Sequence, residues 1–197
     1  MLNRRVQNSA MKTGQINVQT ENIFPIIKKF LYSDHEIFLR ELVSNAVDAS
    51  QKIKTLSSIG EAKGDLGELR IDVVLDAKEK TLSIIDRGVG MTSEEVDKYI
   101  NQVAFSGAEE FMDKYKDANI IGHFGLGFYS AFMVSEKVDI YSKSHTVTPG
   151  VFWSCDGSTE YELYEVDYSA RGTKIVLHIN EESAEFLEAN RVKSILD

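Results

Sequence analysis

The sequence predicts an α+β fold, a two-layer sandwich in which helices pack on one face of a mixed, largely antiparallel sheet. Segments with apolar residues at helical spacing dominate the first half of the chain, and segments that alternate apolar and polar residues dominate the second. A doubly wound parallel fold would require strict alternation of strands and helices, which this pattern lacks. The 197 residues, 43% of them apolar, suffice for one sizeable core, so a single domain is expected over 13–197.

The N-terminal segment begins with a mostly polar stretch, and residues 1–12 are expected to be a disordered extension. Residues 15–19 alternate polar and apolar side chains, a pattern typical of a short edge strand. Apolar residues then recur at helical spacing, which predicts a first helix over 22–32.

Capping boxes predict where three further helices begin, because the two side chains of each box satisfy free N–H groups of the first turn. The boxes are Ser33 with Glu36, Thr92 with Glu95, and Ser106 with Glu109. The first box predicts a long helix over 34–56, and the second predicts a helix that reaches Phe105.

Between these helices the apolar period changes to two, which predicts adjacent strands over 70–75 and 81–86. A short buried helix is expected over 127–134, and an amphipathic helix over 181–196. Four strands are expected between those two helices, over 137–143, 150–154, 160–166 and 173–179.

Charge and cysteine content argue against several classes of function. A net charge of -9 argues against contact along nucleic-acid phosphates, which requires clustered Lys and Arg. Cys155 is the single cysteine, so an internal disulfide and a multi-cysteine zinc site are excluded and a reducing cytoplasm fits. No stretch approaches the ~18 consecutive apolar residues of a membrane span, and no apolar run follows Arg4 and Arg5 as in a secretory signal.

The long helix carries an unusual polar face. Five polar residues at helical spacing share the side opposite the apolar stripe: Glu41, Ser44, Asn45, Asp48 and Lys52. A solvated face would more often pair Lys with Glu, and Asn is a poor helix former in mid-helix. From this segment alone, a solvated surface and an active site are equally supported.

A carboxylate, Asp86, ends the second of the adjacent strands, and Gly88 and Gly90 follow it. One interpretation is an ordinary turn, in which glycine tolerates positive φ and Asp accepts from a backbone amide. The other is that a buried Asp86 accepts a hydrogen bond worth about 1.5–3 kcal/mol from a ligand amino group. That bond would favour adenine over guanine, and the glycines would let the ring lie against bare backbone.

Glycines are also dense before the expected short buried helix, at Gly122, Gly125 and Gly127. Free backbone N–H groups and the positive end of a helix dipole suit an anion such as phosphate. The loop is not a Walker A motif, because no Lys-Ser or Lys-Thr pair follows it, and it is not a dinucleotide fingerprint. Gly172 and Thr173 open the last strand, where Thr is ordinarily a strand former.

Taken in order, these segments resemble the N-terminal ATP-binding domain of the heat-shock protein 90 chaperone family, and its bacterial member most of all. The wider ATPase superfamily includes type II topoisomerases, mismatch-repair ATPases and histidine kinases. The superfamily resemblance rests on E-x-x-x-N-x-x-D-A at 41–49, D-x-G-x-G at 86–90, the glycine loop at 122–127, and Gly172 with Thr173. The chaperone resemblance rests on 32–42, 106–107 and 125–130, and the whole covers roughly 15–196. It implies a Bergerat-type ATP-binding fold.

The resemblance implies a role for each matching residue. Glu41 would be the general base that polarises the attacking water, and Asn45 would coordinate the Mg2+ that bridges the phosphates of ATP or ADP. Asp86 would read adenine with support from Thr173. The base and ribose would contact Asp48, Ala49, Gly90 and Met91, with Lys52 at the rim of the pocket. The phosphates would contact Gly125, Gly127 and the backbone amide of Phe128.

The resemblance also implies a lid over about 101–127, client proteins, a stress response in the cytoplasm, and no nucleic-acid or membrane partner. An arginine that reaches the γ-phosphate and the contacts of a stable homodimer would come from later domains, which are expected to be absent here. The isolated chain is therefore expected to bind ATP and ADP but to hydrolyse ATP very slowly. Two positions depart from the family's pattern. Phe105 stands where many members carry a phosphate-contacting Lys, and Tyr99 stands where some have Asn.

Two other functions stay open. A nucleotide-gated binding module would bind ATP without meaningful hydrolysis, and Glu41→Ala would then leave the rate unchanged. A DNA-acting relative of the same superfamily would show salt-dependent DNA binding.

Overall fold

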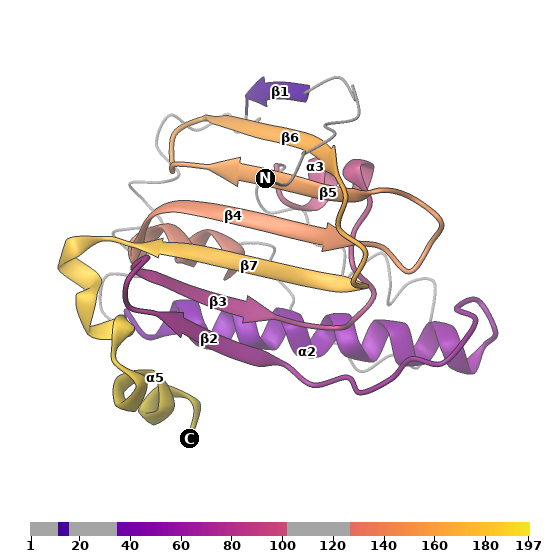
Figure 1. Ribbon diagram of the computed structural model, residues 1–197, viewed down its shortest axis with the longest axis horizontal. Helices are drawn as coiled ribbons and strands as arrows, with labels where there is room; N and C mark the ends of the chain where they lie inside the picture. The colour runs from indigo at the N-terminus through magenta and orange to yellow at the C-terminus, as the bar shows by residue number, and fades with distance from the viewer. Residues whose placement is uncertain (1–11, 16–34, 102–126) are drawn as a thin grey trace, which may run out of the picture.

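A computed structural model of the chain describes residues 12–15, 35–101 and 127–197. Seven strands form one sheet in the order β1-β6-β5-β4-β7-β3-β2, and all of its described pairings are antiparallel (Figure 1). The strands are β1 Lys12–Gln15, β2 Asp72–Asp76, β3 Thr81–Ile85, β4 Ser135–Lys143, β5 Gly150–Cys155, β6 Glu160–Val166 and β7 Gly172–Ile179. The helical elements are α2 Ile37–Ser58, α3 Ser93–Tyr99, η1 Gly127–Met133, η2 Glu181–Leu187 and α5 Ala189–Leu196.

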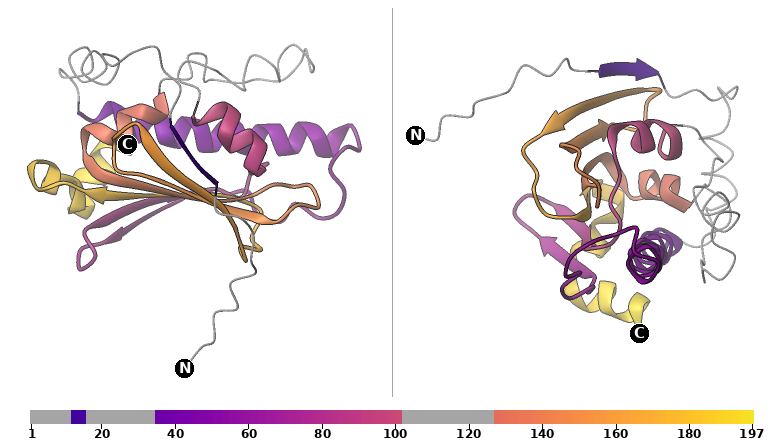
Figure 2. Two further views of the ribbon diagram at one scale, coloured as in Figure 1. Left: turned by 90° about the horizontal axis from the view of Figure 1, so that it is seen from above. Right: turned by 90° about the vertical axis from the view of Figure 1, so that its right-hand side faces the viewer.

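The helices α2, α3 and η1 lie on the same face of the sheet (Figure 2). The helix α2 directs its apolar stripe inward and buries Phe38, Leu39, Leu42, Ala46, Ile53 and Leu56. The sheet meets this stripe with alternate residues of its strands, such as Val138 and Ile140 of β4. The α+β two-layer class predicted from the sequence is confirmed.

Two differences from the predicted elements lie near the N-terminus. The edge strand is described over Lys12–Gln15, so Lys12 belongs to the sheet and not to an extension; residues 16–19 of the predicted strand lie outside the described residues. The predicted helix over 22–32 and Ser33 lie outside the described residues. The long helix begins at Ile37, and its N-cap residue, Glu36, makes no capping hydrogen bond with its side chain. The Glu36 carboxylate pairs with Arg191 at 2.6 Å and with Arg40 at 3.5 Å, and the predicted box with Ser33 lies partly outside the described residues.

The second capping box forms as predicted. The Glu95 N–H donates to the Thr92 hydroxyl at 3.2 Å, and the Thr92 N–H donates to the Glu95 carboxylate at 2.8 Å. The helix α3 ends at Tyr99, however, short of Phe105, which lies outside the described residues together with the third box. Asn101 fixes the chain after this end, because its buried amide oxygen accepts from the Trp153 indole N–H at 2.8 Å.

The predicted last helix is two helices. Glu188 takes an extended conformation between η2 and α5 and so interrupts the helical hydrogen bonds. The interruption lets Phe186 pack edge-on against Phe38 of α2 while Val192 and Ile195 reach the same core from α5. Among the described residues, no helix is long and apolar enough to cross a membrane.

Candidate functional site

Asp86 lies directly after β3, where that strand pairs with β7. Its backbone N–H donates to the Thr173 carbonyl at 2.9 Å. Its carboxylate Oδ1 accepts from the backbone N–H of Gly88 at 2.7 Å and of Thr173 at 3.3 Å. The residue is only 7% exposed. Both hydrogen bonds from the described residues reach Oδ1, and neither uses Oδ2.

Burial raises the pKa of the Asp86 carboxyl to about 6. The hydrogen bonds from Gly88 and Thr173, and the positive charges of Arg171 and Arg87, act in the opposite direction. At neutral pH the carboxyl is therefore mainly ionised and accepts hydrogen bonds only. A buried acceptor of this kind suits an amino group on a ligand.

The two glycines after Asp86 thread the chain between α2 and the end of β4. A Cβ on Gly88 would overlap the backbone of Ala49, and a Cβ on Gly90 would overlap the Lys143 carbonyl. The Val89 N–H between them donates to the Ala49 carbonyl at 3.0 Å. On the side where a side chain would project, protein backbone fills the space at both glycines. The glycines therefore fix the Asp86 turn against α2.

Gly90→Ala is expected to destabilise the chain by about 3 kcal/mol or more, because Gly90 combines a φ of +64° with an overlap against backbone. Gly60→Ala is the matched control, since Gly60 has a φ of +79° but nothing within 4 Å of a Cβ. The control should lose only about 1 kcal/mol. Urea unfolding at equilibrium measures both free energies, and equal losses would contradict the close approach at Gly90.

Ser142 joins three parts of the site. Its hydroxyl is fully buried, accepts from the Met91 N–H at 2.9 Å and lies 2.8 Å from the Thr173 hydroxyl. It also lies 3.2 Å from the Gly172 carbonyl, to which it can donate. Sequence reasoning missed this residue. The sequence feature that could have revealed Ser142 is a serine at a position of β4 that shares the core-facing side with Val138 and Ile140.

The polar face of α2 is partly buried, which a purely solvated face would not be. Asp48 is only 5% exposed, Glu41 and Lys52 are half-buried, and Asn45 is exposed. Burial lowers the pKa of the Lys52 ammonium, and the carboxylates of Asp48 and Glu95 oppose this effect. The predicted residues of α2 thus extend along the helix from Glu41 to Lys52, and α2 meets the Asp86 turn at Ala49.

Glu41 meets the start of η1. A Cβ on Gly127 would overlap the Glu41 carboxylate, so this carboxylate lies against the open side of the glycine. Phe128, the next residue, is buried and packs edge-on against Tyr129 and Trp153, which fixes the start of η1. Gly125 lies outside the described residues.

The predicted residues therefore form two groups joined by α2. In one group, Thr173 donates to the Asp86 carboxylate, Ala49 binds the turn that follows Asp86, and Gly90 and Met91 continue that turn. In the other, Glu41 lies against Gly127, the residue before Phe128, and Asn45 lies on α2 midway between Glu41 and Ala49. Glu41 and Ala49 are about 12 Å apart along the helix axis at 1.5 Å per residue. Two surface hollows of about 610 and 380 Å³ lie beside β5 and β6 and beside the end of η1, and none of the predicted residues lines either hollow.

A metal held by the protein alone does not fit the described residues, which contain no cluster of three His, Cys, Asp or Glu side chains able to hold one. Mg2+ often keeps several waters and binds through one or two protein oxygens together with substrate phosphates. The exposed amide of Asn45 fits that role, as one oxygen ligand to a metal that arrives with phosphates.

Comparison with known proteins identifies similar sequences. The family described as histidine kinase-, DNA gyrase B-, and HSP90-like ATPase matches residues 32–189. Chaperone protein HtpG of Porphyromonas gingivalis is 62% identical over 188 residues, and that of Bacteroides fragilis is 63% identical over 189 residues. These matches cover 94% of the chain and 28% of each relative. Chaperone protein HtpG of Escherichia coli is 45% identical over 194 residues, which cover 94% of the chain and 31% of that relative.

Proposed function

Because the chain belongs to the histidine kinase-, DNA gyrase B- and HSP90-like ATPase family, we propose that the Asp86 turn and the polar face of α2 together form one ATP-binding site. The observation that carries the proposal is the buried Asp86 carboxylate, whose Oδ1 is held by two backbone N–H groups. Its Oδ2 accepts a hydrogen bond from the exocyclic amino group of adenine. Guanine presents a carbonyl at that position, and a carbonyl cannot donate to a carboxylate.

The base and ribose lie beside the Asp86 turn, where the turn packs against α2. Thr173 supports the base through its hydroxyl, which Ser142 holds at 2.8 Å. Asp48, Ala49, Gly90 and Met91 line this end of the site, and Lys52 lies at its rim. Support comes from the hydrogen bond between Val89 and Ala49, which ties the turn to the helix.

The phosphates lie at the other end of the α2 face. Gly125, Gly127 and the backbone amide of Phe128 contact them, and Asn45 supplies one ligand to Mg2+, which neutralises part of their charge. Glu41 acts as the general base that takes a proton from the attacking water. The contact between the Glu41 carboxylate and Gly127 supports a position beside the terminal phosphate.

The chain spans about 28% of the length of the relatives from Porphyromonas and Bacteroides. We therefore extend the proposal to a longer protein of which this chain would be one domain. Residues 12–197 act as one ATP-binding domain of a chaperone whose nucleotide state controls client proteins. Later domains of the same chain complete a homodimer and the hydrolytic site, and the protein serves a stress response in the cytoplasm without nucleic-acid or membrane partners. The relatives' printed name, chaperone protein, supports this reading.

Calorimetric titrations with ADP and GDP test the site at both ends. ADP is expected to bind at least about 100-fold more tightly than GDP, since a carbonyl facing Asp86 leaves a buried carboxylate unpaired. Chelation of Mg2+ is expected to weaken ADP binding by wild type and to have little effect on Asn45→Ala. Equal affinities for ADP and GDP would contradict the role of Asp86, and an Asn45→Ala variant that keeps its Mg2+ dependence would contradict the role of Asn45.

A further inference from the structure

Arg171, just before β7, binds two separate segments of backbone. Its Nε donates to the carbonyls of Arg87 at 3.2 Å and Gly88 at 3.1 Å. Its Nη2 donates to the Arg87 carbonyl at 2.9 Å and to the Leu66 carbonyl at 2.7 Å. One guanidinium thus clamps three carbonyls, two of which belong to the turn that directly follows Asp86.

We propose that Arg171 is a positioning residue for nucleotide binding, which holds the Asp86 turn in place and sets a positive charge beside the Asp86 carboxylate. The ligand in this proposal rests on the proposed function above. The planar fork of Arg reaches several acceptors at once, whereas a Lys ammonium presents a single point of charge. Without the clamp, the carbonyls of Arg87 and Gly88 lose their donor and the turn loses its fixed geometry.

The clamp also connects the turn to a small apolar cluster. Leu66 packs with Val89 against Ile53 and Leu56 of α2 and against Ala62. Arg171 therefore ties the loop after α2, through the Leu66 carbonyl, to the turn that carries Asp86. The orientation of Oδ2 then depends on a residue that need not touch the ligand.

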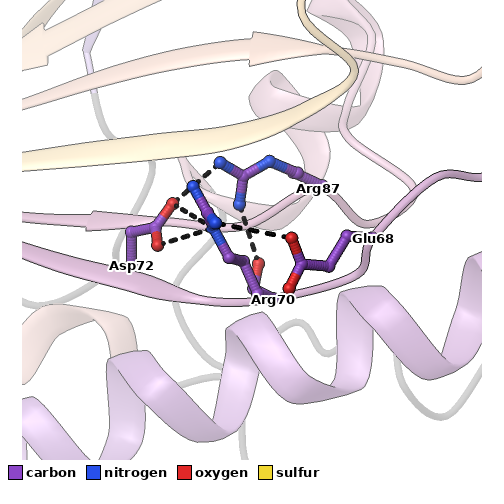
Figure 3. A network of polar contacts seen from close by, with 4 residues as sticks. All are labelled: Glu68, Arg70, Asp72 and Arg87. Carbon is purple, nitrogen blue, oxygen red and sulfur yellow. Dashed lines mark hydrogen bonds and ion pairs between the residues drawn. The ribbon is translucent and has the colours of Figure 1, made fainter.

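The two arginines near Asp86 differ in whether a carboxylate already forms an ion pair with them. Arg87, on the same turn, forms an ion pair with Asp72 at 2.8 Å and belongs to a network with Arg70 and Glu68 (Figure 3). The described hydrogen bonds of Arg171 all go to carbonyls, so no carboxylate offsets its charge there. Tyr168, before β7, also interacts with Asp86, and α2 contributes Asp48 and Lys52 on either side of Ala49. Arg171 is the cation best placed to keep Asp86 ionised.

Two measurements separate the effect of the hydrogen-bond geometry of Arg171 from the effect of its charge. Both are made on the wild type and on the variants Arg171→Gln and Arg171→Lys. The first follows the Asp86 carboxyl carbon by 13C NMR in the free chain, and the second measures ADP binding by calorimetry. In Arg171→Gln we expect the midpoint of the Asp86 titration to rise by about one pH unit, and ADP affinity at pH 7 to fall about 10-fold. In Arg171→Lys we expect a midpoint close to wild type but ADP affinity still reduced about 3-fold or more.

Arg87→Gln is the matched control, because Asp72 already offsets the Arg87 charge; its midpoint should move less than that of Arg171→Gln. Wild-type values of midpoint and affinity in Arg171→Gln would overturn the proposal. Should that variant fail to fold, Arg171→Lys decides, and undiminished ADP affinity there would overturn the clamp. A wild-type chain that binds no ADP would contradict the proposed function instead, while the NMR midpoints would still test the charge effect.

Discussion

Asp86→Asn is expected to weaken ADP binding on the order of 100-fold while making the free chain more stable. Asn keeps an Oδ1 that can accept from the N–H groups of Gly88 and Thr173, so the turn is preserved. It places an NH2 group where Oδ2 was, and two donors then face each other across the adenine contact. The variant loses a charge-assisted hydrogen bond and leaves a ligand donor unpaired.

The gain in stability follows from the pKa of about 6, which lies above the ordinary pKa of an aspartate carboxyl of 3.8. Because the folded state raises this pKa, its stabilising contribution is complete below about pH 4 and is lost as the pH rises through about 6. Above that pH, the buried charge costs the wild type about 2–3 kcal/mol at most. Asn stays neutral and avoids this loss.

Thermal unfolding and calorimetry measure the two effects together. At pH 7.5 the free variant should melt about 4–8 °C above wild type, and the difference should vanish near pH 4. Ala49→Ser is a suitable control, since it changes the pocket wall without changing the charge of Asp86. Undiminished ADP affinity in Asp86→Asn would contradict the adenine assignment, and a lower melting temperature at pH 7.5 would contradict the raised pKa.

Glu41→Ala is expected to slow ATP hydrolysis by about 10²–10⁴-fold in a longer chain that includes the following domain, with ATP affinity largely intact. A general base acts in the transition state, so its loss lowers the rate more than the affinity. The longer chain is used because we propose that an arginine from a following domain takes part in hydrolysis, so residues 1–197 alone should hydrolyse ATP very slowly. Steady-state phosphate release and nucleotide titration measure the two quantities.

Gly127→Ala offers an independent way to move the same carboxylate. The new Cβ would overlap the end of the flexible Glu41 side chain, which can rotate away, so folding should survive while hydrolysis falls. Glu79→Ala, in the exposed turn between β2 and β3, is the control and should hydrolyse ATP as wild type does. Unchanged hydrolysis in Glu41→Ala would favour a nucleotide-gated module in which Glu41 has no catalytic role.

Most of the sheet could be predicted because its signals are local. Side chains alternate along β4 to β7, so a period of two locates those strands within about two residues. The box of Thr92 and Glu95 closes on itself over one turn and formed as predicted. The family resemblance is confirmed, since motifs that stand in a fixed order along the chain identify a family even where each motif alone is ambiguous.

The predictions from sequence failed where contacts between residues far apart in the sequence determine the structure. The helix α2 begins at Ile37 rather than at 34, and Glu36 before it pairs with Arg191 of α5, a partner that no local pattern reveals. Asn101 holds the chain after α3 by binding Trp153 on β5. Ser142 and Arg171 were missed for the same reason. The role of Ser142 follows from the register of β4 with β7, and the role of Arg171 follows from the approach of the Asp86 turn to β7. The spacing of residues along the sequence reveals neither.

A crystal structure of the chain with ADP and Mg2+ tests the central claim most directly. It should show the exocyclic amino group of adenine within about 3 Å of Asp86 Oδ2 and the phosphates beside Gly127 and Phe128. The Mg2+ ion should contact the Asn45 amide oxygen. A base out of reach of Asp86, or a nucleotide seated in the hollow beside β5 and β6, would contradict the account.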